Sequence, residues 1–418
     1  MTRLPKWRTD EAKEVLREQL AEVYTPGAPI TDSALFSGRR EIVADIEEQM
    51  AIIGMHIVLY GERAVGKTSL WSVILSEKKV SHHSASSTDD FVSIFLRVLE
   101  KLGEQFGENE RTRLETGSIA VGAGGTHADV SESTGASEVV LAQRKVDLNL
   151  VLDRIALHSG DLDAIVIDEF QNLPKTTVQS QIIEVVKGFS DRKLKIHMFI
   201  VGVADSSDAL LSSPEYEQYE DRHFTPYRVP VMTDAEVGEI MDLRKQDFGV
   251  DLESDVRDAI VRIASGYPGI AHRLALSATE RWVSRAFVGY VVNIGVALAS
   301  YLVPLVGLVG QLSVKKAGIK VEARDLRAAV QRYVSRWDES LPTSPVPYEE
   351  LVVLISKSET PYLSASAGEE ALGLSAEELD QLVADSSGLV TRDVLGLKLQ
   401  RPDVRCYFEA KRYLARAA

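Results

Sequence analysis

Cysteine is almost absent from this sequence: Cys406 is the single thiol in 418 residues. One thiol cannot close a disulfide within its own chain, so a fold held together by disulfides is excluded. The first eight residues also lack the apolar core of a secretion signal. These two absences predict a cytoplasmic protein.

Basic residues are fewer than acidic residues. Lysine and arginine number 47 against 62 aspartate and glutamate residues, which gives a formal net charge of −15. A protein that coats nucleic acid needs a basic field, so only a local basic patch is compatible with DNA binding. DNA binding therefore stays open but is not favoured.

The histidines show no metal-ligand spacing, and His82 and His83, as neighbours on an expected strand, point to opposite faces. No metal cluster built from histidines is therefore expected.

Charge of either sign is missing from Ala286 to Leu312, although 26% of all residues are charged. The apolar part of this stretch, residues 287–309, is as long as the roughly 20 residues that span a bilayer. Three interpretations stay open: a buried helical hairpin or oligomer contact, a membrane-inserted or re-entrant segment, and a switch element exposed on activation. Residues that weaken helices favour a break into two helices here: Gly289, Gly295, Pro304, Gly307 and Gly310.

The first half of the chain has the rhythm of an α/β protein. Short apolar runs at Ile57–Tyr60, Ala164–Ile167 and Met198–Val203 alternate with helical periodicity. Such runs are typical of strands buried on both faces, as in a parallel sheet. We therefore predict an N-terminal helical segment over residues 1–29, followed by a three-layer α/β domain with a parallel sheet over residues 30–230.

The second half is predominantly helical. Thr233 and Glu236 have the spacing of a capping box, which predicts a helix from there to Phe248. We expect a helical lid over residues 231–340, which contains the charge-free stretch 286–312. Residues 341–418 read as helices with a two-stranded hairpin, a pattern typical of a winged-helix-like domain.

The sharpest motif runs from Gly61 to Thr68 and has the form G-x-x-x-x-G-K-T between an expected strand and an expected helix. Its glycines let backbone N–H groups turn toward a phosphate, while Lys67 reaches the β and γ phosphates and Thr68 binds Mg²⁺. The predicted phosphate-loop residues are Gly61, Ala64, Val65, Gly66, Lys67, Thr68 and Ser69.

A second motif places two carboxylates, Asp168 and Glu169, directly after the apolar run at Ala164–Ile167. In a parallel sheet this end of the strand lies beside the phosphate loop. Asp168 is therefore the expected second Mg²⁺ ligand, and Glu169 the expected base that polarises the attacking water. The two motifs together predict ATP and Mg²⁺ as the bound species.

These motifs resemble the AAA+/STAND superfamily of P-loop ATPases, and more specifically bacterial ATPases with an origin-recognition-like AAA domain. The resemblance implies that Phe36 and Gly38, in an F-x-G-R-x-x-E box, line the adenine site. It implies a sensor 1 role for Asp205 or Ser206, and contact of Pro268 in a G-x-P motif with the base. It also implies a homo-oligomer or a protein partner.

The sequence departs from this family at two points. Gly269 stands where the family carries its sensor 2 arginine, so His272 or Arg273, one helical turn further, is the candidate substitute. Arg222 lies where such proteins place an arginine finger that acts on a neighbouring subunit. The alternative for Arg222 is a surface ion pair with Glu220 or Asp221.

The function predicted from these residues is an ATP-hydrolysing molecular switch whose nucleotide state is coupled to the lid and tail. The alternatives are an ATP-dependent DNA-binding regulator, a membrane-associated ATPase that uses residues 287–309, and a scaffold that holds ATP without hydrolysis. Against DNA binding, the expected recognition helix of the tail carries Glu377, Glu378 and Asp380 and no basic residue.

Overall fold

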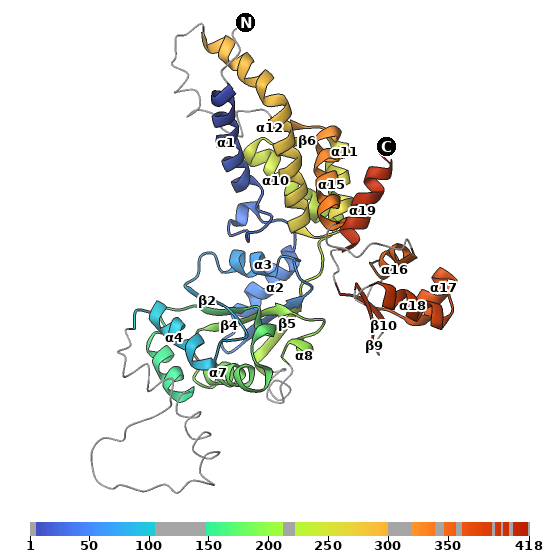
Figure 1. Cartoon of the computed structure of the whole chain (residues 1–418). Helices are drawn as coiled ribbons and strands as arrows, with labels where there is room; N and C mark the ends of the chain where they lie inside the picture. The colour runs from blue at the N-terminus through green and yellow to red at the C-terminus, as the bar shows by residue number, and fades with distance from the viewer. Residues whose placement is uncertain are drawn as a thin grey trace, which may run out of the picture. The chain divides into compact units, whose positions relative to one another are not determined.

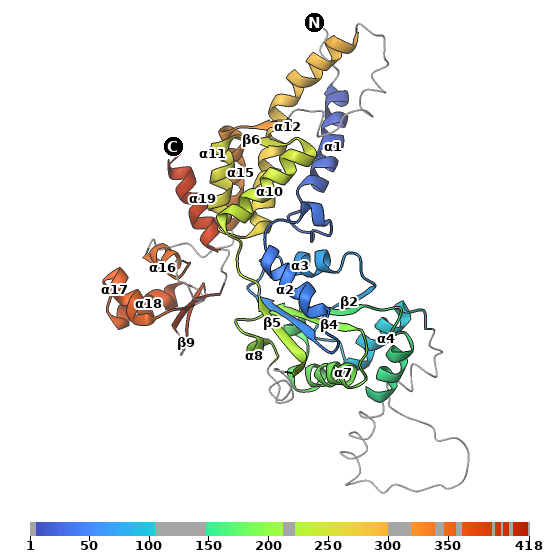
Figure 2. The same cartoon turned by 180° about the vertical axis from the view of Figure 1, so that it is seen from behind.

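The computed structural model describes residues 6–104, 148–211, 222–299, 319–338, 347–356, 362–386, 389–393, 396–400 and 404–416 (Figures 1 and 2). Contacts divide the chain into two compact units. The sheet unit comprises Arg40–Glu62 and Lys67–Val229, and the helical unit comprises Met1–Arg39, Arg63–Gly66 and Pro230–Ala418. Residues 116–137, which are rich in Gly, Ser, Thr and Ala, lie outside the described residues.

The sheet unit is built on five parallel strands in the order β2-β3-β4-β1-β5. The strands are β1 (His56–Gly61), β2 (Val80–Ser84), β3 (Ala164–Asp168), β4 (His197–Val203) and β5 (Phe224–Arg228). The sequence pattern did not predict β5, because Pro226 and polar neighbours interrupt its apolar periodicity. Proline is tolerated there because β5 is an edge strand, where one side of the backbone needs no partner.

Two helical layers enclose this sheet, as both views show (Figures 1 and 2). Alternate strand residues, among them Val58, Ile165 and Ile200, share a buried cluster with α4 (Phe91–Lys101), with the helix over residues 148–157, and with α7 (Ser180–Asp191). On the other face, α2 (Arg40–Met50) and α3 (Lys67–Ile74) cover β1. The predicted three-layer α/β fold with a parallel sheet is confirmed.

In the helical unit, α12 (Pro268–Ala299) contacts four other helices. These are α1 (Lys6–Val23), α10 (Asp234–Phe248), α11 (Ser254–Ala264) and α15 (Ala323–Asp338). The predicted capping box is confirmed, since Thr233 Oγ1 accepts from the Glu236 N–H at 3.2 Å and Glu236 Oε2 accepts from the Thr233 N–H at 2.8 Å. A two-residue parallel pair of β6 (Asp251–Leu252) and β7 (Lys320–Val321) was not predicted.

The helical periodicity that begins near Ile270 predicts a helix that ends at about Arg285, but α12 continues to Ala299 and enters the charge-free stretch. It passes through Gly289 and Gly295 without a break, because glycine costs a helix only about 1 kcal/mol, whereas proline costs about 3. The expected break at Pro304 lies outside the described residues, as does all of residues 300–318. Within the ranges given above, no helix is both long and apolar enough to cross a membrane.

The C-terminal part contains the predicted hairpin. Strands β9 (Val390–Asp393) and β10 (Gly396–Leu399) pair antiparallel, and β8 (Tyr362–Leu363) adds a third strand in the order β8-β10-β9. The helices are α16 (Pro347–Ser356), α17 (Ala365–Leu372), α18 (Ala376–Asp385) and α19 (Val404–Arg416). Assignment of this part as a winged-helix domain stays a prediction.

Candidate functional site

The predicted phosphate loop connects β1 to α3, and its glycines adopt backbone conformations that other residues rarely take. Gly61, Ala64 and Gly66 adopt φ values of 144°, 64° and 90°. A Cβ at Gly61 would lie only 2.5 Å from the Val229 carbonyl oxygen, so no other residue fits there. Such left-handed positions turn successive N–H groups to one side of the chain, which creates a concave anion site.

Lys67 lies at the start of α3 and is almost fully buried, at 8% exposure. Its Nζ donates to the carbonyl oxygens of Gly61 at 3.0 Å and of Glu62 at 2.7 Å. The ammonium group therefore lies along the loop that precedes it. Ser69 follows within the same helix and is partly buried.

A second cation, Arg39, holds the middle of the loop. Its guanidinium donates to the carbonyl oxygens of Val65 and, at 3.0 Å, of Pro230, and its side chain is only 8% exposed. Burial lowers the pKa of Arg39 to about 10, against the opposing charge of Glu236. When N–H groups turn inward to a phosphate, carbonyl oxygens turn outward and need donors, and Arg39 supplies one.

Arg39 belongs to the F-x-G-R box, but sequence reasoning assigned no role to its side chain. The preceding Gly38 has φ 70°, and a Cβ there would lie 2.4 Å from Glu236 Oε1. The N–H groups of Gly38 and Arg39 donate to Glu239 Oε2 at 3.0 Å and to Glu236 Oε1 at 2.6 Å. Phe36 ends the short η1 helix (Ser33–Leu35) and is partly buried.

Thr68 and Asp168 are brought together by the sheet, as their spacing predicted. Thr68 Oγ1 donates to Asp168 Oδ2 at 2.8 Å, across 100 residues of sequence. Trp71 Nε1 also donates to Asp168 Oδ2, at 3.2 Å, and Asp168 is 6% exposed. The Trp71 contact was not predicted, because nothing in the sequence marks a helix tryptophan as a carboxylate partner.

Glu169 has a left-handed backbone, with φ 56°, at the end of β3. Gln171 Nε2 donates to Glu169 Oε2 at 2.5 Å, while Gln171 Oε1 accepts from the Val203 N–H at 2.8 Å. Gln171 thus links the predicted base to the end of β4. Sequence reasoning missed Gln171; its position two residues beyond the carboxylate pair was the one available signal.

Past the end of β4, the two sensor 1 candidates differ. Ser206 is the N-cap of the short α8 helix (Ser207–Leu210), and its hydroxyl accepts from the Ala209 N–H at 3.1 Å. Asp205 is partly exposed. Both residues therefore stay candidates for the sensor 1 role.

In the helical unit, Pro268 opens α12 and lies beside the phosphate loop. A Cβ at Gly66 would lie 3.5 Å from Pro268 Cγ, which is ordinary van der Waals contact. The preceding Tyr267 is buried, and the Arg405 guanidinium stacks on its ring at 4.7 Å from the ring centroid. The G-x-P turn is therefore in contact with both the loop and the tail helix α19.

The proposed sensor 2 substitutes do not share one environment. His272 is buried, its Nδ1 accepts from the Thr25 N–H at 3.2 Å, and its ring packs edge-on against Tyr24. Burial, with help from the Arg244 charge, lowers the pKa of His272 to about 3. A neutral imidazole supplies no positive charge to a phosphate. Arg273 is exposed.

Arg222 is exposed and lies two residues before the start of β5. Its two candidate ion-pair partners, Glu220 and Asp221, lie outside the described residues.

The donor set at Thr68 and Asp168 suits Mg²⁺. A hydroxyl and a carboxylate are hard oxygen ligands, and Mg²⁺ is commonly bound through one or two carboxylates together with substrate phosphates. Among the described residues, no group of three His, Cys, Asp or Glu side chains could hold a metal by itself. A metal at Thr68 and Asp168 would therefore complete its coordination with water or phosphate oxygens.

No family model and no curated protein matches this sequence. Several solved structures are similar to it. The RuvB Holliday junction branch migration motor of Thermotoga maritima has 13% identity and a TM-score of 0.42, over 87% of this chain and 93% of that chain. A Walker-type ATPase of Pyrococcus abyssi has 14% identity and a TM-score of 0.47, over 91% and 98% of the two chains. Cdc6p of Pyrobaculum aerophilum has 14% identity and a TM-score of 0.46, over 95% and 98%.

The fold itself follows from the features of this chain. A parallel five-stranded sheet, a glycine-containing loop between β1 and α3, and two carboxylates at the end of β3 occur together. This is the α/β fold of a P-loop nucleotide-binding protein.

Proposed function

We propose that this protein binds ATP with Mg²⁺ and hydrolyses it, as part of a molecular switch of the AAA+/STAND kind. The observation that carries the proposal is the 2.8 Å hydrogen bond from Thr68 to Asp168. It joins the phosphate loop to the carboxylate strand, the two halves that a hydrolytic P-loop enzyme needs. The resemblance of the sequence motifs to that superfamily points the same way.

Each of these residues is proposed to have its own role in phosphoryl transfer. The loop N–H groups and Lys67 bind and orient the β and γ phosphates, and Thr68 and Asp168 hold Mg²⁺, which neutralises developing charge when bound. To bind a phosphate, Lys67 Nζ would redirect N–H donors from the Gly61 and Glu62 carbonyls. This exchange replaces neutral acceptors with charged ones, so it favours the nucleotide-bound form.

Glu169 is proposed to orient the attacking water and accept its proton. The hydrogen bond from Gln171 holds one carboxylate oxygen and leaves the other for the water. Gln171 also contacts Val203 at the end of β4, and the proposed sensor of the γ phosphate, Asp205 or Ser206, follows that strand. The proposed adenine contacts are Phe36, Gly38 and Pro268, the last supported by its position beside Gly66.

The remaining parts of the proposal rest on the resemblance alone. They are the coupling of nucleotide state to the lid and tail, assembly into a homo-oligomer, and Arg222 as the arginine finger. DNA is not proposed as a partner, because the expected recognition helix, α18, carries acidic residues and no basic residue that could contact phosphate or base edges.

Substitutions at two positions test this function. Lys67→Ala should abolish ATP binding, whereas Glu169→Gln should bind ATP normally and hydrolyse it about 100-fold more slowly. Binding is measured with a fluorescent ATP analogue, and turnover by phosphate release. Glu184→Gln, an exposed carboxylate on α7, is the matched control and should leave both unchanged. Wild-type turnover in Glu169→Gln would remove Glu169 as the base, and no phosphate release from the wild-type protein would refute hydrolysis.

A further inference from the structure

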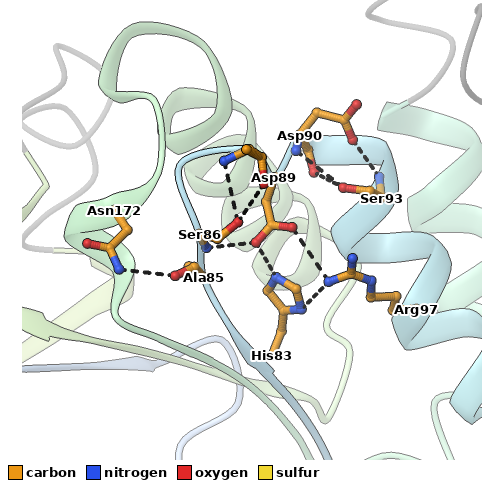
Figure 3. Close-up of polar contacts among 9 residues, drawn as sticks. His83, Ala85, Ser86, Asp89, Asp90, Ser93, Arg97 and Asn172 are labelled. Atoms are coloured by element: carbon orange, nitrogen blue, oxygen red, sulfur yellow. Dashed lines mark hydrogen bonds and ion pairs between the residues drawn. The ribbon is translucent and has the colours of Figure 1, made fainter.

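The loop that follows β2 is tied to the segment that follows β3. Ala85 makes both connections: its N–H donates to the Asp168 carbonyl at 2.8 Å, and its carbonyl accepts from Asn172 Nδ2 at 3.1 Å. Figure 3 shows Asn172 reaching Ala85 from the neighbouring segment. Asp168 and Asn172 flank Glu169 in sequence, so Ala85 contacts the carboxylate segment on both sides of the proposed base.

Asp89 in turn holds the loop itself. Its Oδ2 accepts from the Ser86 N–H at 2.7 Å and from His83 Nε2 at 2.9 Å, and Arg97 Nη1 lies 3.5 Å from Oδ1. Figure 3 shows the three donors converging on this carboxylate. Asp89 is only 8% exposed, so its charge is desolvated and depends on these partners.

The protonation states in this cluster follow from the donors. Arg97 Nη1 lies 3.3 Å from His83 Nδ1, and a guanidinium can only donate. Nδ1 must therefore accept, which leaves the proton on Nε2 for Asp89. Burial works to raise the pKa of Asp89, but the hydrogen bonds from Ser86 and His83 and the charge of Arg97 hold that pKa below its ordinary value.

We propose that Asp89 is a positioning residue for the carboxylate pair Asp168–Glu169. It fixes the Ala85–Ser86 peptide through the Ser86 N–H, and Ala85 holds the end of β3 in place. The inference rests on the proposed hydrolysis, because positioning matters only if Asp168 and Glu169 act on ATP. Asp89 itself touches neither of them and does no chemistry.

Substitution of Asp89 should therefore affect turnover more than binding. ATP affinity comes mainly from the phosphate loop, whereas the reaction needs the water and Glu169 in near-attack geometry. A misplacement of about 1 Å can cost about 100-fold in rate. For a partial loss of support in Asp89→Asn, we expect kcat to fall roughly tenfold, with KM for ATP within about twofold of wild type.

The matched control is Asp90→Asn, in the next position along the chain. Asp90 caps α4 by accepting from the Ser93 N–H at 2.7 Å and, among the described residues, makes no hydrogen bond to Ala85 or Ser86. Asparagine caps a helix about as well as aspartate, so this variant should keep both its stability and its kcat close to wild type. Asn172→Ala removes the second tie to Ala85, and the double variant with Asp89→Asn should lose less than the product of the single losses, because both act through one segment.

Amide hydrogen exchange supplies a readout that does not require hydrolysis. The Ala85 and Ser86 amides donate to Asp168 and Asp89, so Asp89→Asn should speed their exchange at least tenfold while amides in β1 stay unchanged. Unchanged exchange, or wild-type kcat in Asp89→Asn, would overturn the inference. Parallel losses of kcat and ATP affinity that track the unfolding midpoint would also overturn it. If wild-type protein releases no phosphate, the proposed function fails separately.

Discussion

At the scale of single residues, two cationic side chains donate hydrogen bonds to backbone carbonyl oxygens of the phosphate loop. Arg39 holds Val65, and Lys67 holds Gly61 and Glu62. The two cations differ in one respect: a guanidinium anchored also to Pro230 is fixed, whereas a flexible ammonium can exchange its partners. Arg39 therefore suits a structural role in the loop, and Lys67 suits the role of phosphate ligand.

Two buried histidines predict acid sensitivity of the fold. His56 accepts from the Met198 N–H, and His272 accepts from the Thr25 N–H, both through Nδ1. Burial, reinforced by neighbouring positive charge, lowers the pKa of each to about 3. The unfolded chain takes up these protons near pH 6.5, so stability is full above that pH and falls as pH decreases. At pH 5 each histidine should cost about 2 kcal/mol of unfolding free energy.

The measurement is urea unfolding at pH 7.5 and pH 5.0. Asparagine keeps an acceptor close to Nδ1 but does not titrate, so His56→Asn and His272→Asn should each shrink the loss between the two pH values by about 2 kcal/mol. His158→Asn, a partly exposed histidine paired with Glu104, is the control. Equal pH dependence in all four proteins would show that the buried imidazoles do not determine it.

At the scale of elements, strands and helices were predicted correctly where the local sequence pattern was clear. Strands β1, β3 and β4 are apolar runs, and α10 carries its own capping box, so local patterns were sufficient. They failed for β5, which has too few apolar residues, and for the end of α12. Both depend on neighbours that are distant in sequence: β5 exists because β1 offers it a partner.

The tail helix α19 shows how one element depends on another. It packs on α11 and α15, Arg405 donates to the Ser265 carbonyl and stacks on Tyr267, and Tyr407 Oη donates to Asp338 at 2.5 Å. We expect Arg405→Ala to lower the unfolding free energy of the helical unit by about 1–3 kcal/mol, through loss of the hydrogen bond and the cation–π contact.

Arg405→Lys should recover part of that loss, because an ammonium keeps the charge over the ring. Arg416→Ala, at the exposed end of the same helix, should stay within about 0.5 kcal/mol of wild type. Chemical unfolding followed by tryptophan fluorescence measures all three. If Arg405→Ala and Arg416→Ala behave alike, the contact with Tyr267 does not anchor the helix.

At the scale of the whole molecule, the open matter is whether ATP drives assembly. The resemblance implies an oligomer in which Arg222 reaches a neighbouring subunit, and Arg222 is exposed as that role requires. With Glu169→Gln to slow hydrolysis, we expect ATP to convert the protein to a larger species, with ADP less effective. Sedimentation velocity measures the change.

Arg222→Ala is the matched variant for this experiment. It should still assemble with ATP but lose turnover about 1,000-fold, as expected for an arginine finger. A protein that stays monomeric with ATP at every concentration tested would eliminate the role in trans. Wild-type turnover in Arg222→Ala would leave Arg222 as a surface residue.

The sequence by itself was sufficient to predict the candidate site and the strand–helix order around it. The phosphate loop, the carboxylates Asp168 and Glu169, and the strand–helix rhythm all depend on short-range rules of backbone conformation and side-chain periodicity. Those rules act over a few residues and are therefore legible in a linear pattern.

The tertiary structure decided which residues meet. The contact of Thr68 with Asp168, across 100 residues, was predicted, but nothing in the sequence indicated that Thr25 and His272, 247 residues apart, would meet. The same holds for Arg39 on the phosphate loop, Trp71 on Asp168, and Ala85 beside the carboxylate segment. These contacts satisfy polar groups that folding buries, and burial is a property of the packed chain. Acidic residues outnumber basic ones over the whole sequence, but the fold places two of the 47 lysine and arginine side chains against one loop.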